Sequence, residues 1–137
     1  MLIKTELKRE GARHPKYAKD LDVGADVFLP ENFTLMPGIV NKVPLGIAVH
    51  IPQGFEGNLR PRSGTLIKRG ITIHNPAIDP GYTGEIHAMV SIVGDEPVFV
   101  EAGDRICSLV ITPFIRAQFV TEIINDRGDK GFNSTGA

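Results

Sequence analysis

Ile86-His-Ala-Met-Val-Ser-Ile92 is the stretch that decides the fold class, because apolar and less apolar residues alternate along it. A period of two places alternate side chains on the two faces of a β-strand, whereas a helix needs a period near 3.6. One face of this strand is therefore expected to pack on a core and the other to meet solvent. The expected inward set is Ile86, Ala88, Val90 and Ile92.

The same pattern continues over most apolar clusters of the chain. Strand-like runs lie at residues 47–52, 98–100, 106–111 and 118–124, and Gly or Pro turns separate them. Residues 65–69 lack both Gly and Pro and are the best candidate for a brief helical turn. The sequence predicts an all-β domain, as a sandwich, jelly roll or barrel, without repeats or linkers.

Composition limits the possible partners. The chain has 137 residues, 42% of them apolar and 23% charged, as expected for one globular domain. Its net charge of −1 gives no overall attraction to nucleic acid or to an anionic membrane, so we expect neither partner. Cys107 is the single cysteine, the histidines lack ligand spacing, and no signal peptide or membrane span is recognised. We expect a cytoplasmic protein, or a protein of the infected host's cytosol if the source is viral.

Residues 127–137 carry the groups of a nucleotide-binding arm. Arg127 offers positive charge, Ser134 and Thr135 offer hydroxyl groups, and glycines let the backbone approach an anion. Phe132 supplies a flat face for a base, and such stacking is worth roughly 1–3 kcal/mol. By composition alone, a frayed glycine-rich tail explains the same segment.

Two internal loops also carry chemistry. Pro61-Arg-Ser-Gly64 combines a guanidinium, a hydroxyl and a flexible N–H group, which suits a phosphate, although a plain turn has the same composition. In the loop at residues 74–85, Asp79 precedes Tyr82 across a Pro-Gly turn. Asp79 could orient water as a general base, or it could simply cap the turn.

Two further loops complete a recognisable series. Asp22-Val-Gly-Ala-Asp26 precedes the phosphate-type loop, and Gly103-Asp-Arg-Ile106 follows the acidic one. With Ile78-Asp-x-x-Tyr-x-Gly-Glu85 and Arg127-Gly-x-x-Gly-Phe-x-Ser-Thr-Gly136, these segments resemble the five motifs of the trimeric dUTPase family, over residues 22–136. The resemblance is highly specific, because the last four of these five motifs would all have to occur in this order by chance.

The resemblance implies a jelly-roll-like β-barrel that assembles as a homotrimer, with active sites at subunit interfaces. Residues 1–124 would form the barrel and residues 125–137 an arm that closes over the active site. The implied activity is hydrolysis of dUTP to dUMP and pyrophosphate with Mg²⁺. This reaction limits uracil incorporation into DNA and supplies dUMP for thymidylate synthesis.

The resemblance also assigns roles to residues on the nucleoside side of the site. Asp79 would activate the attacking water and bind the 3′-hydroxyl, while Tyr82 would pack beneath the deoxyribose and exclude a 2′-hydroxyl. Backbone groups of residues 75–84 would read uracil. The substrate-binding residues of this loop are Asn75, Ile78, Tyr82 and Glu85.

On the phosphate side, Ser63 and Gly64 would hold the phosphates and Arg62 would support that loop. Asp26 would contact Mg²⁺ through coordinated water, since the metal in this family sits on the triphosphate. The arm would act as a lid, with Phe132 stacked on uracil. Its residues at the γ-phosphate would be Arg127, Ser134 and Thr135.

Two departures from the family pattern affect the site. Pro76 stands where the family usually has Gly, so the entry to the uracil loop can differ. Ser108 stands where the family has Gln, and its shorter side chain would reach the phosphates through water.

Two other functions stay open. A dCTP deaminase has the same fold, but that branch has a catalytic glutamate at the position of Met89. A nucleotide-binding regulatory protein on the same scaffold would bind dUTP without turnover. Product analysis separates the three functions.

Overall fold

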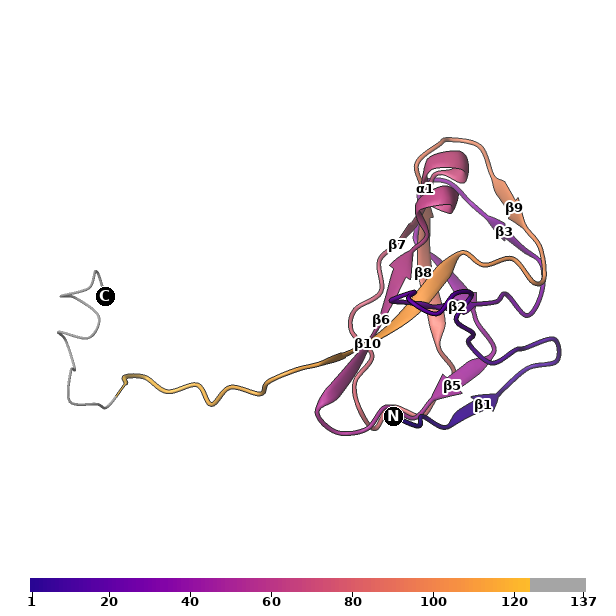
Figure 1. Cartoon of the computed structure of the whole chain (residues 1–137). Coiled ribbons are helices and arrows are strands. Elements are labelled where there is room, and N and C mark those ends of the chain that lie inside the picture. The colour runs from indigo at the N-terminus through magenta and orange to yellow at the C-terminus, as the bar shows by residue number, and fades with distance from the viewer. Residues whose placement is uncertain (124–137) are drawn as a thin grey trace.

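The computed structural model describes residues 1–123, which form a body of short strands with one extended end (Figure 1). The strands of this range are β1 (Thr5–Leu7), β2 (Ala25–Val27), β3 (Phe33–Leu35), β4 (Asn41–Pro44), β5 (Ile47–Val49), β6 (Phe55–Pro61), β7 (Ile71–Ile73), β8 (His87–Ile92), β9 (Val98–Val100) and β10 (Cys107–Pro113). One helix, α1 (Ser63–Arg69), joins β6 to β7 within the described range.

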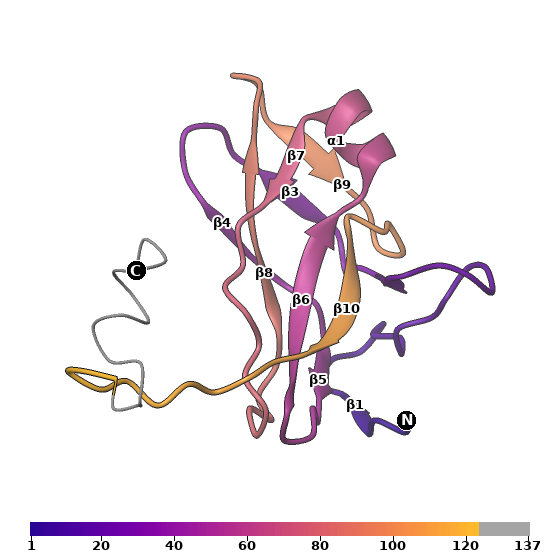
Figure 2. The ribbon, with the colours of Figure 1, turned by 60° about the vertical axis from the view of Figure 1, so that its left-hand side comes forward.

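The strands pair antiparallel in four small sheets. β10 lies between β2 and β6, β8 lies between β4 and β7, and the remaining pairs are β1 with β5 and β3 with β9. Most neighbours are distant in sequence, so the chain crosses repeatedly between sheets, as Figure 2 shows from a second side. The predicted all-β, jelly-roll-like fold is confirmed.

β8 has the alternation that the sequence predicts. Ala88 and Val90 are fully buried while Met89 faces outward, and Ile92 is buried at the end of the strand. β5 differs, because Ala48 is as buried as Ile47 and Val49. The expectation of a half-buried strand over residues 47–52 is therefore wrong: the strand ends at Val49 and is covered on both faces.

The predicted helical turn at residues 65–69 is confirmed, and the helix begins two residues earlier. It ends at Gly70, whose φ of 66° lies in the left-handed region that glycine adopts at little cost. Its last turn carries Lys68 and Arg69, which suit the negative end of the helix dipole. No helix of residues 1–123 is long and apolar enough to cross a membrane.

The strand predicted at residues 118–124 is absent over its described part, residues 118–123. Residues 114–123 instead leave the body as extended chain, and the Phe119 side chain is 92% exposed (Figure 1). A strand needs a partner edge for its backbone hydrogen bonds, and the described part of this chain provides none there. The predicted arm at residues 125–137 lies outside the described residues.

Candidate active site

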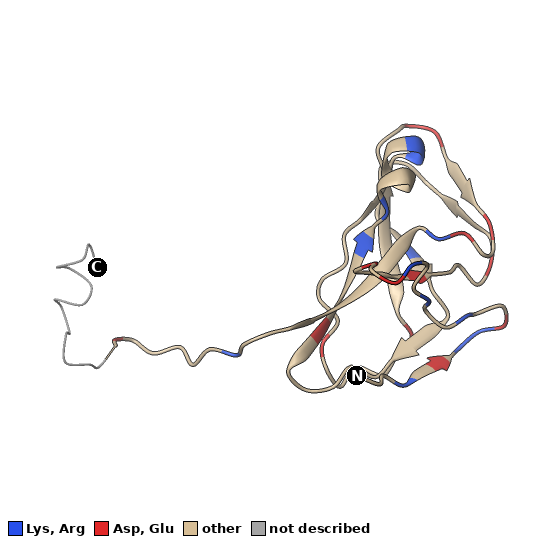
Figure 3. Ribbon diagram, in the orientation of Figure 1, with Lys and Arg blue, Asp and Glu red and all other residues tan. Residues whose placement is uncertain are grey.

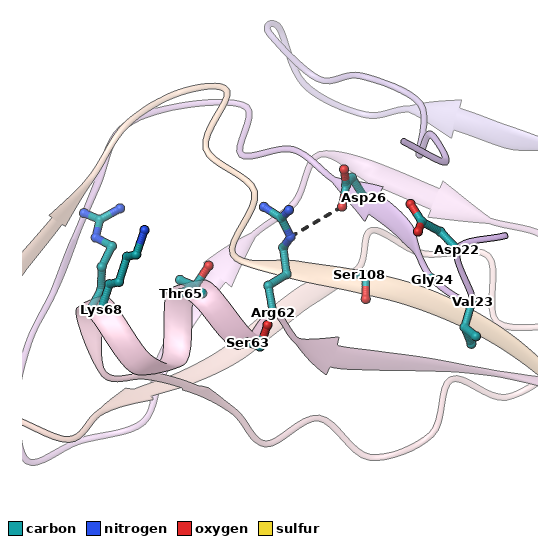
Figure 4. Close-up of a pocket in the computed structure, with 11 residues that line it drawn as sticks. Asp22, Val23, Gly24, Asp26, Arg62, Ser63, Thr65, Lys68 and Ser108 are labelled. Atoms are coloured by element: carbon teal, nitrogen blue, oxygen red, sulfur yellow. Dashed lines mark ion pairs between the residues drawn. The ribbon is translucent and has the colours of Figure 1, made fainter. Parts of the chain in front are cut away.

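One cavity of about 520 Å³ collects most of the predicted phosphate-side residues (Figure 4). Its position follows from the order of three strands: Asp26 on β2 is the register partner of Ser108 on β10, and β10 also pairs with β6, which leads into α1. The lining residues are Asp22, Val23, Gly24, Asp26, Arg62, Ser63, Gly64, Thr65, Lys68, Arg69 and Ser108.

Asp26 is nearly buried and is neutralised by two arginines. Arg105 Nη1 lies 3.2 Å from Asp26 Oδ2, and Arg62 Nε lies 3.5 Å from Asp26 Oδ1. Arg62 also donates to the backbone oxygen of Arg105, at 3.3 Å. The Arg62 guanidinium is thus tied to protein groups, which suits support of the loop better than direct contact with phosphate.

Two glycines shape the cavity in different ways. A Cβ atom on Gly24 would lie 2.5 Å from Ser108 Oγ, so Gly24 makes the room that Ser108 occupies. A Cβ atom on Gly64 would meet nothing within 4 Å, and the backbone there is ordinary helix. The fold itself does not require glycine at position 64. Close approach of a ligand to the backbone there would require it.

α1 adds positive charge that the sequence analysis did not assign to the site. Lys68 and Arg69 both line the cavity, and they form the blue end of α1 in Figure 3. Arg69 is paired with Asp104 at 3.3 Å. The sequence could have indicated this role for them, because they stand four and five residues after Gly64, about one helical turn along α1.

Cys107, next to Ser108, is structural. Its side chain points into the core, and burial raises the pKa of the thiol to about 12. The thiol therefore stays protonated at neutral pH and is a poor nucleophile.

A second cavity, of about 340 Å³, collects the predicted nucleoside-side residues. We call residues 75–85 the acidic hairpin. Asp79 is exposed in it, just before the turn formed by Pro80 and Gly81. The cavity is lined by Lys42, Asn75, Pro76, Ala77, Ile78, Asp79, Tyr82, Glu85, Ile86, His87 and Met89.

Backbone pairing and one amide side chain hold the acidic hairpin in place. Ile78 and Gly57 exchange backbone hydrogen bonds of 2.7 and 3.0 Å, which anchors the hairpin to the beginning of β6. The Asn75 side chain donates to the His87 carbonyl and accepts from the Met89 N–H, both at 2.7 Å. Because its amide is engaged with β8, Asn75 offers a ligand its backbone groups.

Tyr82 and Glu85 are joined within this hairpin. Tyr82 Oη donates to the Glu85 carbonyl at 2.9 Å, and the ring lies over Gly84, where a Cβ atom would be 2.7 Å from the hydroxyl. The Glu85 carboxylate accepts hydrogen bonds from Arg9 and from the Gly46 N–H. The Arg9 guanidinium is the main cause that lowers the pKa of Glu85.

The two cavities lie at opposite ends of β6 and share no residue. Ile78 is bound at Gly57, whereas α1 begins at Ser63, so the two ends are about 20 Å apart at the rise of an extended strand. One chain therefore brings the predicted residues together as two groups. Arg127, Phe132, Ser134 and Thr135 lie outside the described residues.

The carboxylates of the described residues are placed to hold a metal ion only indirectly. Within residues 1–123 no group of three or more His, Cys, Asp or Glu side chains could hold a metal ion directly. Both carboxylate oxygens of Asp26 already face arginines. The donor set fits a hydrated ion that a ligand carries and Asp26 contacts through water.

The fold and the two cavities define a jelly-roll-like all-β protein with a basic, hydroxyl-bearing pocket and a separate acidic hairpin. The family model for dUTPase matches residues 10–136. The chain belongs to the dUTPase family.

Relatives match almost the whole chain. The deoxyuridine 5′-triphosphate nucleotidohydrolase of Anaeromyxobacter sp. (strain Fw109-5) is 39% identical over 146 residues, with 99% of each chain covered. The protein of the same name from Clostridium tetani is 36% identical, with 98% of this chain and 96% of that protein covered. Among solved structures, a mutant dUTPase of phage 80alpha is 28% identical with a TM-score of 0.81, covering 97% of this chain and 98% of that one.

Proposed function

We propose that this protein hydrolyses dUTP to dUMP and pyrophosphate in the cytoplasm, which limits uracil incorporation into DNA and supplies dUMP for thymidylate synthesis. The observation that carries the proposal is full-length membership of the dUTPase family, together with the phosphate-type cavity and the acidic hairpin on one chain. The roles below are proposals for individual residues.

The phosphates bind in the cavity at the beginning of α1. Ser63 donates its hydroxyl, and the backbone at Gly64 approaches the triphosphate in the space that a side chain would fill. Lys68 adds charge from the next turn of the helix, and Ser108 reaches the phosphates through water. Arg62 orients the loop through Asp26.

The nucleoside binds at the acidic hairpin. Exposed Asp79 accepts a proton from the attacking water as general base and binds the 3′-hydroxyl. Tyr82 packs beneath the sugar, and its closeness rejects a 2′-hydroxyl. The backbone around Asn75 and Ile78 reads uracil, because the Asn75 amide is engaged with β8.

The active site forms between subunits of a homotrimer. Asp79 follows Ile78, which is bound at Gly57 of β6, and Ser63 begins α1 just after β6; these two places are about 20 Å apart, which is too far for the α-phosphate to reach both on one chain. Two copies must therefore contribute the two halves of each site. Residues 114–123 run away from the body (Figure 1). Arg127, Phe132, Ser134 and Thr135 are proposed to complete the site, and they lie outside the described residues.

Asp26 would hold a hydrated Mg²⁺ carried by the triphosphate through its water, and the ion would neutralise phosphate charge. Arg62 and Arg105 hold Asp26 in place.

The test is pyrophosphate release from dUTP, dCTP, dTTP and UTP in parallel with Mg²⁺, with the base of each product identified. Selective conversion of dUTP to dUMP supports the proposal, and deamination of dCTP contradicts it. Binding of dUTP without turnover would favour a regulator instead. That second candidate has one observation behind it: the phage 80 dUTPase of the structural comparison has a SaPI inducing capacity as well as enzymatic activity.

A further inference from the structure

Behind the acidic hairpin lies a polar cluster to which the amino-terminal segment contributes. We call it the Arg9 clasp, and it consists of Arg9, Glu31, Gly46 and Glu85. Arg9 belongs to the loop after β1, whereas Glu85 closes the hairpin that carries Asp79 and Tyr82. The clasp thus joins segments 76 residues apart.

Arg9 grips Glu85 with two parallel hydrogen bonds. Its Nε lies 2.5 Å from Glu85 Oε2 and its Nη2 lies 3.1 Å from Oε1. Only a guanidinium presents donors in this fork, which fixes the plane of the carboxylate as well as its position. The third nitrogen, Nη1, donates to Glu31 at 3.3 Å.

The backbone on which the clasp is built is close-packed, which holds Gly46 and the segment before Arg9 in place. The Lys8 N–H donates to the Gly46 carbonyl at 2.7 Å, while the Gly46 N–H donates to Glu85 Oε2 at 3.0 Å. A Cβ atom on Gly46 would lie 2.8 Å from Ala12 Cβ. The Glu85 side chain is only 18% exposed, which shields its bonds from water.

Glu85 passes this restraint on to Tyr82. The hydroxyl of Tyr82 bonds the carbonyl of the same Glu85 whose carboxylate Arg9 holds. The Tyr82 main chain is held by its N–H bond to the Asp79 carbonyl at 3.2 Å, and the outer end of the ring is held by the hydroxyl bond to the Glu85 carbonyl. A shift of the Glu85 main chain would therefore move or release the ring.

We propose that Arg9 is a positioning residue for sugar selection, which acts through Glu85 on the Tyr82 ring. The proposal rests on the proposed function, in which this ring packs beneath the deoxyribose. The ring can exclude a 2′-hydroxyl by steric contact only while it stays close to C2′ of the sugar. Loss of the Arg9 fork lets the ring retreat and makes room for the 2′-hydroxyl.

The kinetic signature follows from where the ring acts. It contacts the sugar in the ground state and in the transition state alike, so its loosening weakens binding of dUTP more than it slows chemistry. Arg9→Ala should raise KM for dUTP with kcat little changed. The dUTP-to-UTP ratio of kcat/KM should fall about tenfold, since close packing rejects an added hydroxyl by only about a hundredfold and the loosened ring loses part of that.

The experiment compares Arg9→Ala, Arg9→Lys and wild type, with Arg13→Ala as the matched control. Arg13 lies in the same amino-terminal segment but stacks on Phe28, 4.9 Å from the ring centroid, so its loss should leave the ratio unchanged. Arg9→Lys keeps the charge without the fork and should still lower the ratio. Hydrogen exchange at the Gly46 amide should accelerate in both Arg9 variants, independently of activity.

An unchanged dUTP-to-UTP ratio in a folded Arg9→Lys protein would overturn the role of Arg9, as would an equal loss in Arg13→Ala. Failure of the wild-type protein to turn over dUTP would instead contradict the proposed function. In that case the ratio of affinities for non-hydrolysable analogues of dUTP and UTP tests Arg9 on its own.

Discussion

Two aspartates of this site have opposite surroundings at the residue scale. Asp26 is nearly buried and held by Arg62 and Arg105, whereas Asp79 is exposed beside a turn. Both carboxylate oxygens of Asp26 are engaged by arginines, whereas Asp79 lies exposed at the edge of a cavity, where water can reach it. The proposed function therefore uses Asp79 as the base and Asp26 as an anchor.

Asp79→Asn should lower the rate of pyrophosphate release by roughly 100- to 10,000-fold, because it removes a base and keeps the shape of the side chain. Affinity for a non-hydrolysable dUTP analogue should change little. Both quantities are measured on one preparation. Retention of normal turnover would rule out Asp79 as the base.

Gly64→Ala should separate stability from activity. Alanine stabilises a helix by up to about 1 kcal/mol relative to glycine, and the added methyl group meets nothing in the protein. It fills the space proposed for the triphosphate, so kcat/KM for dUTP should fall at least about tenfold. Thermal unfolding and steady-state kinetics give the two values.

Gly94→Ala is the control for this prediction, since a Cβ atom there also meets nothing and the backbone φ is not positive. It should leave both stability and kinetics near wild type. Equal activity in Gly64→Ala would show that no ligand enters the space beside Gly64.

At the scale of elements, β6 determines the spacing of the site. Its beginning anchors the acidic hairpin through Gly57 and Ile78, and its end leads into α1 and the phosphate cavity. Its seven residues pair along their whole length with β10, so the two ends cannot approach each other by bending. β6 therefore separates the two halves of the site within one chain.

The β1–β5 pair should give the protein an acid-sensitive element. Lys8 and His50 hold the Glu6 carboxylate, with Lys8 the larger cause, and lower its pKa to about 2 from an ordinary 4.5. A lowered pKa stabilises the folded state above pH 4.5, and this contribution is lost as the pH falls from 4.5 towards 2. Glu6→Gln should therefore be less stable than wild type at neutral pH, and the difference should vanish near pH 2.

Denaturant titrations at a series of pH values measure that difference. Glu10→Gln is the control, because Glu10 is exposed and forms no ion pair among the described residues. If the difference in free energy of unfolding between Glu6→Gln and wild type stays constant down to pH 2, the assigned ion pairs are contradicted.

At the scale of the whole molecule, the described residues form a continuous core, while the two candidate cavities of one chain lie apart. The buried cluster is continuous, with Leu35, Leu45 and Ile71 fully enclosed. The two cavities nevertheless stay apart, and the extended residues 114–123 leave large side chains such as Phe119 exposed. The proposed association with further copies would bring the two kinds of cavity together and would cover some of the exposed apolar side chains.

Two inactive variants should therefore restore activity when mixed. Asp79→Asn disables the acidic hairpin, and Ser63→Ala with Lys68→Ala disables the phosphate cavity. If each site takes its halves from different copies, random mixed trimers should recover about a quarter of the wild-type rate. Unfolding and refolding of the mixture, followed by a pyrophosphate assay, tests this prediction. Recovery of no activity would place both halves on one chain.

The sequence determined the period-two strands, the helical turn and the order of the motifs, because these depend on residues close together along the chain. Tertiary structure decided the rest: the double cover of β5, the missing strand at residues 118–123, the charge that Lys68 and Arg69 add, and the grip of Arg9 on Glu85. Each of these depends on which distant segments meet or which partner edge is present. Local sequence patterns do not predict such long-range contacts, so the separation of the site residues into two groups is visible only in the tertiary structure.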